Sequence, residues 1–570
     1  MQIRHPSGNR SGRRFSPYDI LFALCFLLIL AFCIWKLPYG FGRDDEALYA
    51  SLPLHFAQGA RLITEEWNLT QFFFLLMTPV ISLFHAVTGS FDGVMMFLRM
   101  LYLAIHALTV MAVYARLRRI NSWGALLAGC LLFLFTPYDI MSCSYNTIGL
   151  DCMMLAAAMM ATGSRNSRVL PAICGVLFSV AVLATPFLAL LFVLYFLYAF
   201  ISRGKDIAVW YRFVWFTAGV AAAALPYLLL VLSQNSLQEI LSGLPLLLDD
   251  PSHGKGTGIL ESAAQLLRNA PSGTALLFAL YIIHLLVMLM DKKRGSHCIA
   301  HLICAVLISL AALLQAMRSL PNECYHAMFP PLAMLGLTAY VLTKNKCKPV
   351  FAFMFVPGVV YGLTMHFSSN NGYYAFSLAM FVAAAAGILM MADFVRELLA
   401  ADNISKQLSR LAACAMLLVY LAAAGEACYV KLRHTFWDTD PRASDMTISS
   451  GPAKGMKTHT DTDNAAVYDA VIRDLADVNA LPAGKLFVVD HRSWCYLAAD
   501  RHQISAYSPW LTDLDTLSRV SRYYQLHPNQ MPDYVYILHD SGVSPDTVKQ
   551  ALGGTWARQD REISTLLVRE

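Results

Sequence analysis

Residues 18–37 read YDILFALCFLLILAFCIWKL, an apolar run long enough to cross a bilayer as one α-helix. Four arginines lie before it, within residues 1–17. The run ends on Cys33-Ile-Trp-Lys36, which lacks the small residues of a signal-peptidase site. We therefore expect an uncleaved anchor helix at the beginning of the chain rather than a signal peptide.

The composition agrees with a membrane protein. Hydrophobic residues make up 57% of the 570 residues, charged residues only 14%, and the mean hydropathy is +0.50. Soluble chains carry about 25% charged residues. The net charge of +5 is modest, so we expect no nucleic-acid partner.

Twelve further apolar stretches follow, giving thirteen predicted spans. They lie at 92–115, 123–139, 147–162, 169–186, 187–201, 213–233, 274–290, 298–317, 327–343, 349–366, 373–392 and 411–430. With a cytoplasmic N-terminus (1–17), the predicted inside segments hold 21 Lys and Arg, whereas the outside segments before the tail hold 5. This asymmetry follows the positive-inside rule. It predicts a multi-pass plasma-membrane protein whose transmembrane domain covers 18–430.

The stretch 71–88, QFFFLLMTPVISLFHAVT, is apolar enough to be read as another span. That reading would place the basic loop after residue 115 outside and invert most later loops. We expect an interfacial helix instead, within a first outer loop at 38–91.

The tail from 431 to 570 is richer in charged and turn residues. Short β-like runs (485–490, 534–538, 564–568) alternate with helix-like stretches (465–478, 513–526, 544–552). This alternation predicts a small soluble α/β domain, placed by the span count outside the cytoplasm.

Three consecutive carboxylates, Asp44, Asp45 and Glu46, follow the anchor helix directly. Acidic residues in a first helical turn also suit the helix dipole, so a purely structural role is the competing interpretation. Glu66 and Gln71 add polar side chains later in the same loop.

The motif Asp45-Glu46-Ala-Leu-Tyr49-Ala50 resembles the first outer loop of membrane glycosyltransferases of the GT-C fold. These include the protein O-mannosyltransferases and the bacterial aminoarabinose transferases. Gln58-Gly59, the apolar stretch 72–86 and Arg99 follow in a similar order. The resemblance covers about residues 18–200 by motif and the rest by layout.

The resemblance implies a catalytic carboxylate at Asp45, supported by Glu46 and Asp44, and a polyprenyl-phosphate sugar as donor. It also implies a divalent cation, Mg or Mn, at Asp45 and Glu46. Arg99 would contact the donor phosphate, or pair with Asp92. Many relatives carry a Lys with paired prolines after this loop, and here 67–71 (WNLTQ) stands in that place.

Later outer loops supply further candidates for substrate binding. Tyr145 and Asn146 lie between the acidic candidates Asp139 and Asp151, and Asn371 lies in another short polar loop. Asn146 could instead form a turn, and Asn371 could cap a helix.

His326 is another such candidate. A histidine from a later loop reaches the site in aminoarabinose transferases. A structural role is the alternative, because a lone histidine is more often structural.

The sequence thus predicts a glycosyltransferase that moves a sugar from a polyprenyl-phosphate carrier to a hydroxyl of an envelope glycan, lipid or protein. Two alternatives share the outer location, a transporter or flippase of lipid-linked glycans and a polymerase or ligase that uses a lipid-diphosphate donor. A non-catalytic scaffold is a third. Transporters commonly carry ionisable groups near the bilayer midplane and repeated halves, and no repeat is visible in the sequence.

Overall fold

The computed structural model describes residues 16–570 with internal gaps. The gaps are 43–44, 165, 249–258, 269, 271–272, 295–297, 320–325, 344–345, 370, 401–405, 434–442, 447, 450–457, 461, 490 and 510–515. Asp44, one of the three predicted carboxylates, lies outside the described residues.

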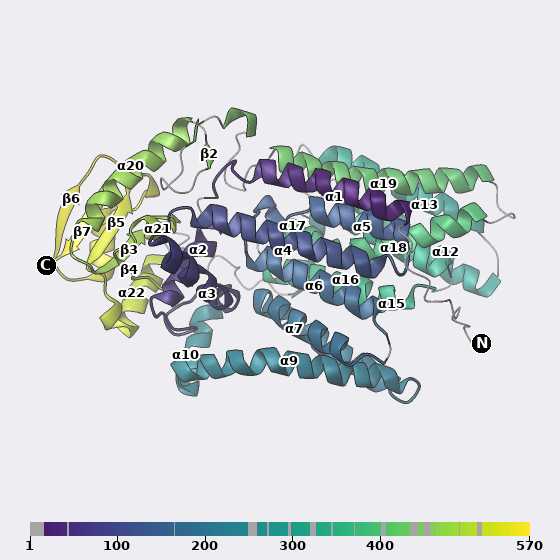
Figure 1. Cartoon of the computed structure of the whole chain (residues 1–570), viewed down its shortest axis with the longest axis horizontal. Helices are drawn as coiled ribbons and strands as arrows, with labels where there is room; N and C mark the ends of the chain where they lie inside the picture. Colours follow the sequence, from purple (N-terminus) through teal and green to yellow (C-terminus); the bar gives the residue numbers. More distant parts are fainter. Residues whose placement is uncertain are drawn as a thin grey trace.

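Helices make up the first three quarters of the chain. They are α1 Pro17–Lys36, α2 Asp45–Ala57, α3 Gln71–Thr88, α4 Val94–Leu117, α5 Ser122–Leu134, η1 Pro137–Asp139, α6 Tyr145–Thr162, α7 Val169–Ala184, η2 Pro186–Leu188, α8 Ala189–Ser202, α9 Ile207–Gln234, α10 Leu237–Leu248, α11 Ile259–Arg268, α12 Thr274–Arg294, α13 Cys298–Ser319, α14 Phe329–Leu342, α15 Lys348–Val350, η5 Phe351–Phe355, α16 Val356–Ser368, α17 Gly372–Ala379, α18 Phe381–Ala400 and α19 Lys406–Arg433. Figure 1 shows α1, α4, α9 and α19 along the long axis of the molecule.

Seven described helices are long and apolar enough to cross a membrane, or up to eight if the bent pair Gly372–Ala379 and Phe381–Leu398 is one span. Six shorter apolar helices of 10–17 residues accompany them. The chain is therefore a helical membrane protein by length and composition. The predicted count of thirteen spans stays a prediction, because several of its members correspond to these shorter helices.

Small residues let the long helices approach closely. A Cβ added at Gly336 on α14 would lie 2.1 Å from the Cα of Gly387 on α18, so neither position has room for a side chain. A Cβ added at Gly219 on α9 would likewise lie 1.9 Å from the carbonyl oxygen of Ala172 on α7. In a membrane such contacts replace the hydrophobic driving force between helices.

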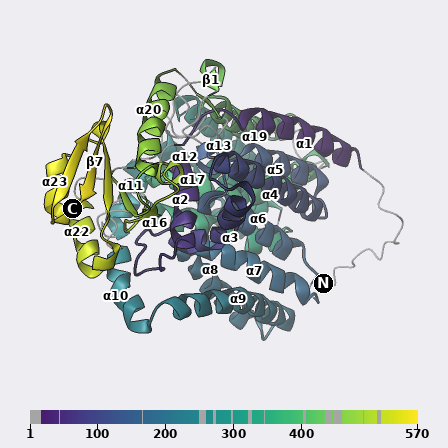
Figure 2. The same ribbon diagram turned by 60° about the vertical axis from the view of Figure 1, so that its left-hand side comes forward.

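The helix α3 is long and apolar enough to count among the seven candidate spans. In Figures 1 and 2 it lies across the direction of α1 and α4 rather than beside them. The interfacial placement expected for 71–88 stays a prediction. The orientation of α3 agrees with it.

The C-terminal part folds around a five-stranded sheet of order β4-β3-β5-β7-β6. The strands are β3 Lys485–Val489, β4 Gln503–Ile504, β5 Tyr534–Leu538, β6 Trp556–Asp560 and β7 Ser564–Arg569. The helices are α20 Thr462–Asn479, α21 Cys495–Ala498, α22 Thr516–Leu526 and α23 Pro545–Leu552, and a small pair of strands, β1 Ile448–Ser449 and β2 His459–Thr460, precedes them. Short 3-10 turns are η6 Ala443–Asp445, η7 Pro528–Gln530 and η8 His539–Ser541.

Strand β3 pairs in parallel with β4 and β5, whereas β7 pairs antiparallel with β5 and β6. The predicted α/β character is therefore confirmed, with β4 and β6 added to the three expected strands. This domain lies at one end of the helix bundle, beside α2 and α3 (Figures 1 and 2). We call that end the domain face and the opposite end, near α15, the far face.

Candidate functional site

The predicted first outer loop, residues 38–91, places its two described carboxylates in different surroundings. Asp45 begins α2 and is partly exposed, whereas Glu46 is fully buried. Because consecutive helical residues point about 100° apart, the two carboxylates face different partners. Most of α2 is buried, so the helix is a rigid support for Asp45.

Glu46 forms a two-pronged ion pair with Arg99 of α4. The Arg99 Nε lies 2.7 Å from Glu46 Oε1, and Nη2 lies 2.8 Å from Oε2. Arg99 also donates to the carbonyls of Leu37 and Gly40, and the Gly42 amide donates to Glu46. The ion-pair alternative for Arg99 thus holds, but its partner is Glu46 instead of Asp92. Glu46 and Arg99 thus hold the loop in position. Asp45 remains as the described carboxylate of the motif that can take part in catalysis.

Asp45 lies near three tyrosines. Its negative charge helps to raise the pKa of Tyr49 of α2, Tyr138 of η1 and Tyr145 at the start of α6. The ring centroids of Tyr49 and Tyr145 are 6.1 Å apart, edge to face. We call Asp45 and these three tyrosines the acidic site. Burial raises the pKa of Tyr138 and of Tyr49, so both phenols keep their protons.

The loop that carries Tyr138 is held in an unusual backbone conformation. Tyr138 has φ 56° and Asp139 has φ 53°, in the left-handed region that non-glycine residues rarely adopt. Such conformations persist where surrounding contacts enforce them, and they concentrate at functional sites. In this conformation the Tyr138 hydroxyl reaches the side-chain amide of Asn371.

Two predicted substrate contacts lie beside the tyrosines. The Asn371 amide donates to Tyr138 Oη at 3.3 Å, and Asn146 lines a small hollow next to Tyr138 and Tyr361. The hollow holds about 10 Å³, room for a hydroxyl or one water and not for a sugar ring. Asn146 and Asn371 thus lie beside Tyr138, and Asp45 lies near Tyr138 and Tyr145.

A buried charged layer lies behind this site. Lys36 Nζ is 3.2 Å and Lys431 Nζ is 3.4 Å from the two carboxylate oxygens of Asp139. Lys431 also donates to Thr136 Oγ1 at 2.7 Å. Asp139 is thus a structural counter-ion. Asp151, the other acidic candidate, accepts from His106 at 2.8 Å within the bundle.

Glu66 and Gln71 brace the first outer loop. Glu66 accepts from His55 Nδ1 at 2.9 Å and from the Asn68 amide at 3.0 Å, and burial raises its pKa. Gln71 accepts from the Ile63 amide at 2.7 Å and donates to the Glu66 carbonyl at 3.0 Å. Both side chains are fully buried, so they stabilise the loop and do not contact a substrate.

His326 does not reach the acidic site. Its ring is 1% exposed and packs against Phe135 and Phe329, with centroid distances of 4.7 and 5.2 Å. Neither ring nitrogen has a hydrogen-bond partner among the described residues. Burial lowers the pKa of His326 to about 3. We therefore assign it to packing, the alternative weighed from the sequence.

The residues present do not fit the metal implied for Asp45 and Glu46. Both oxygens of Glu46 are bound by Arg99, and the described residues contain no group of three or more His, Cys, Asp or Glu side chains that could hold an ion. A hard cation needs several oxygen ligands.

The C-terminal domain covers the first outer loop. The Trp67 amide donates to the Tyr507 carbonyl at 2.8 Å, and the two rings stack at 5.4 Å. Gln58 accepts from the Ile504 amide at 2.8 Å. The segment 67–71 thus begins with a docking contact.

Sequence reasoning did not single out Tyr49, Tyr138, Lys36 and Lys431. Lys36 and Lys431 carried a usable signal, because each is a cation at the end of a long apolar run. The tyrosines carried little, since aromatic residues are common at membrane interfaces whatever their role.

No family model matches the chain, and no curated protein matches it in sequence. Among solved structures, the crystal structure of ArnT from Cupriavidus metallidurans bound to undecaprenyl phosphate is similar to it. The similarity covers 97% of this chain and 98% of that chain, at 13% identity and a TM-score of 0.41.

Proposed function

We propose that the protein is a membrane glycosyltransferase that transfers a sugar from a polyprenyl-phosphate carrier to a hydroxyl of an envelope glycan, lipid or protein. One observation carries this proposal. Asp45, a partly exposed carboxylate at the start of α2, lies near Tyr49, Tyr138 and Tyr145 where the helix bundle meets the C-terminal domain. A base beside aromatic rings and amides suits sugar chemistry at a membrane surface.

In the proposed reaction Asp45 is the general base. The acceptor oxygen attacks C1 of the sugar as its proton passes to the Asp45 carboxylate. The new bond joins C1 to the acceptor oxygen, the bond from C1 to the phosphate oxygen breaks, and its electron pair leaves with the phosphate. Attack opposite the leaving group inverts C1.

The neighbouring side chains would bind and orient the sugar. The Tyr138 hydroxyl and the amides of Asn146 and Asn371 offer hydrogen bonds from one side. The small hollow beside Tyr138 and Asn146 fits one sugar hydroxyl, which would fix the ring above it. The partly exposed ring of Tyr145 supplies an apolar face for the sugar's C–H groups.

The proposed topology follows the distribution of Lys and Arg. The N-terminus is cytoplasmic, and the domain face, with the acidic site and the C-terminal domain, is extracytoplasmic. The C-terminal domain packs on the first outer loop through Trp67 and Gln58, so an envelope acceptor would approach Asp45 beside it.

The test is transfer by the full chain in lipid nanodiscs, with labelled polyprenyl-phosphate sugars as donors and an envelope extract as acceptor. Asp45→Asn should lower the rate by about 10²–10⁴-fold, because the amide cannot take the proton. Asp92→Asn is the matched control, since Asp92 is exposed between α3 and α4.

Equal transfer by wild type and Asp45→Asn would remove Asp45 from the reaction. Transfer only from polyprenyl-diphosphate glycans would favour the polymerase or ligase alternative. Movement of intact lipid-linked glycan across the bilayer, with no new glycosidic bond, would favour the flippase alternative.

A further inference from the structure

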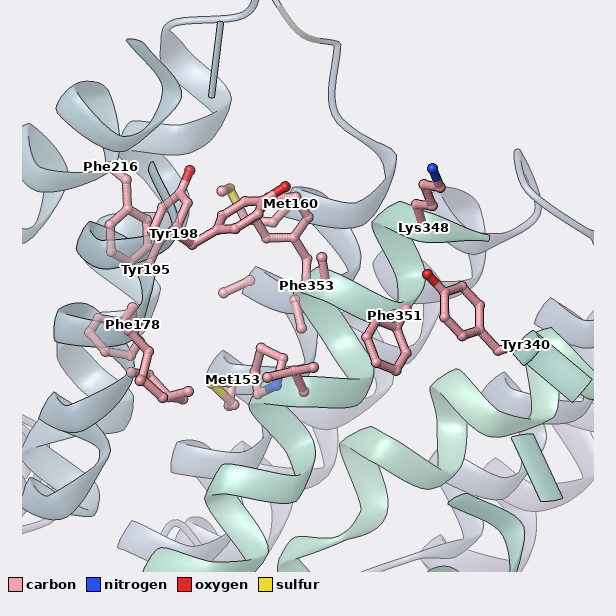
Figure 3. Close-up of a pocket in the computed structure, with 17 residues that line it drawn as sticks. Met153, Met160, Phe178, Tyr195, Tyr198, Phe216, Tyr340, Lys348, Phe351 and Phe353 are labelled. Atoms are coloured by element: carbon pink, nitrogen blue, oxygen red, sulfur yellow. The ribbon is translucent and has the colours of Figure 1, made fainter. Parts of the chain in front are cut away.

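A second cavity lies at the far face, between α6, α7, α8, α9 and the η5–α16 segment (Figure 3). Its volume is about 430 Å³, within the ~300–1,000 Å³ typical of small-molecule sites. Apolar and aromatic side chains form most of its wall. Leu194, Tyr198 and Lys348 are exposed, so the cavity opens to the surface along them.

The polar groups of the cavity gather at one end. In Figure 3 the Tyr195 and Tyr198 hydroxyls point toward the same end as the Lys348 amine, whereas Phe178 and Met153 line the other end. The Tyr195 hydroxyl is buried and has no hydrogen-bond partner among the described residues. A buried hydroxyl without a partner costs free energy, and a bound acceptor would satisfy it.

Arg212 of α9 stands directly behind the aromatic wall. Arg212 is only 8% exposed, and its Cζ lies 5.0 Å from the ring centroid of Phe353. Nη2 donates to the Met160 carbonyl at 2.6 Å, but Nε is buried without a partner. In the part of the chain that the structure describes, no carboxylate forms an ion pair with Arg212. A buried arginine in an apolar bundle is costly and marks a functional site by default.

We propose that this cavity binds an anionic glycerophospholipid, with one acyl chain in the aromatic part and the phosphate at the polar end. Arg212 and Lys348 supply the positive charge, and the Tyr195 hydroxyl donates a further hydrogen bond. Arg212 and Lys348 belong to the predicted cytoplasmic segments 202–212 and 344–348, so the lipid comes from the cytoplasmic leaflet. Basic pockets between membrane helices on that side are suited to anionic headgroups.

The phosphate bound here is not the one that reacts in the proposed transfer. Helix α6 connects the two places, with Asn146 beside the acidic site and Met160 beside Arg212. Fourteen residues at 1.5 Å per residue separate them by about 21 Å. The lipid site is therefore independent of the proposed activity, and either can fail alone.

The experiment measures the unfolding midpoint of the purified full chain in detergent as phosphatidylglycerol or phosphatidylcholine is added. We expect phosphatidylglycerol to raise the midpoint and phosphatidylcholine to raise it less. Arg212→Gln should weaken the apparent affinity for phosphatidylglycerol by about tenfold or more. Arg396→Gln is the matched control, an exposed arginine of α18 in a predicted cytoplasmic segment.

A second variant guards against misfolding of Arg212→Gln. Ala157→Phe adds a ring at the cavity wall while Arg212 remains, so it should fold and lose the preference for phosphatidylglycerol. The proposal is overturned if Ala157→Phe keeps the wild-type preference, or if both lipids act equally on the wild type. If glycerol phosphate raises the unfolding midpoint as much as phosphatidylglycerol does, the site binds a soluble phosphate. If a polyprenyl phosphate displaces phosphatidylglycerol by binding more tightly, the site belongs to the donor lipid. Either result overturns the proposal.

Discussion

Among single residues, His326 separates a structural role from a catalytic one. Its imidazole is buried between Phe135 and Phe329, with a pKa lowered to about 3 by burial. In the unfolded chain an imidazole titrates near 6.5. The folded state therefore stays neutral while the unfolded state takes up a proton, and this contribution to stability is lost as the pH falls from about 6.5 toward 3.

His326→Phe should remove this pH dependence and leave glycan transfer unchanged. The measurement is the unfolding midpoint in detergent between pH 7 and pH 4, where the wild type should lose more stability than the variant. His85→Phe, an exposed histidine of α3, should keep the wild-type slope. A loss of transfer by a folded His326→Phe protein would instead restore the substrate-binding role.

The sequence could group Asp45, Tyr145, Asn146 and Asn371 as candidates because each lies at or next to a helix end. Helix ends follow from hydropathy, so residues at the same face can be grouped without a structure. The partners of buried charges cannot be grouped in this way. Glu46 and Arg99 lie 53 positions apart, and their pairing depends on how α2 packs beside α4.

Among the elements, α1, η1 and α19 meet at one carboxylate. Lys36 ends α1, Lys431 lies near the end of α19, and both contact Asp139 of η1. The apolar runs that form α1 and α19 could be found in the sequence. Their contact through Asp139 could not, since Lys36 and Lys431 are separated by 395 residues.

This geometry predicts an asymmetry between substitutions. Asp139→Asn leaves two buried ammonium groups without their shared counter-ion, so it should lower the free energy of unfolding by about 3–5 kcal/mol. Lys431→Met keeps the pair between Lys36 and Asp139 and should cost less. Denaturant unfolding of each variant in detergent tests the order. Equal losses, or a larger loss for Lys431→Met, would show that Asp139 does not join the three elements.

For the whole molecule, the soluble domain and the first outer loop behave as one unit. The Arg519 guanidinium of α22 lies 5.4 Å from the Trp67 ring and 5.0 Å from the Tyr507 ring. Its Nη2 also donates to the Leu246 carbonyl of α10 at 2.6 Å. One side chain thus links the domain, the loop and the helix bundle. A cation on two aromatic rings contributes most when, as here, it is partly shielded from water.

Arg519→Ala should loosen the domain from the loop without unfolding either part. We expect faster hydrogen exchange in residues 61–71 and a higher KM for the acceptor, because the loop that carries Asp45 loses its cover while the base itself is intact. Arg522→Ala is the matched control, an exposed arginine on the same helix. If both variants exchange like the wild type, Arg519 does not hold the interface. If Arg519→Ala lowers kcat with an unchanged acceptor KM, the domain acts on the geometry of the reaction at Asp45 rather than on acceptor binding.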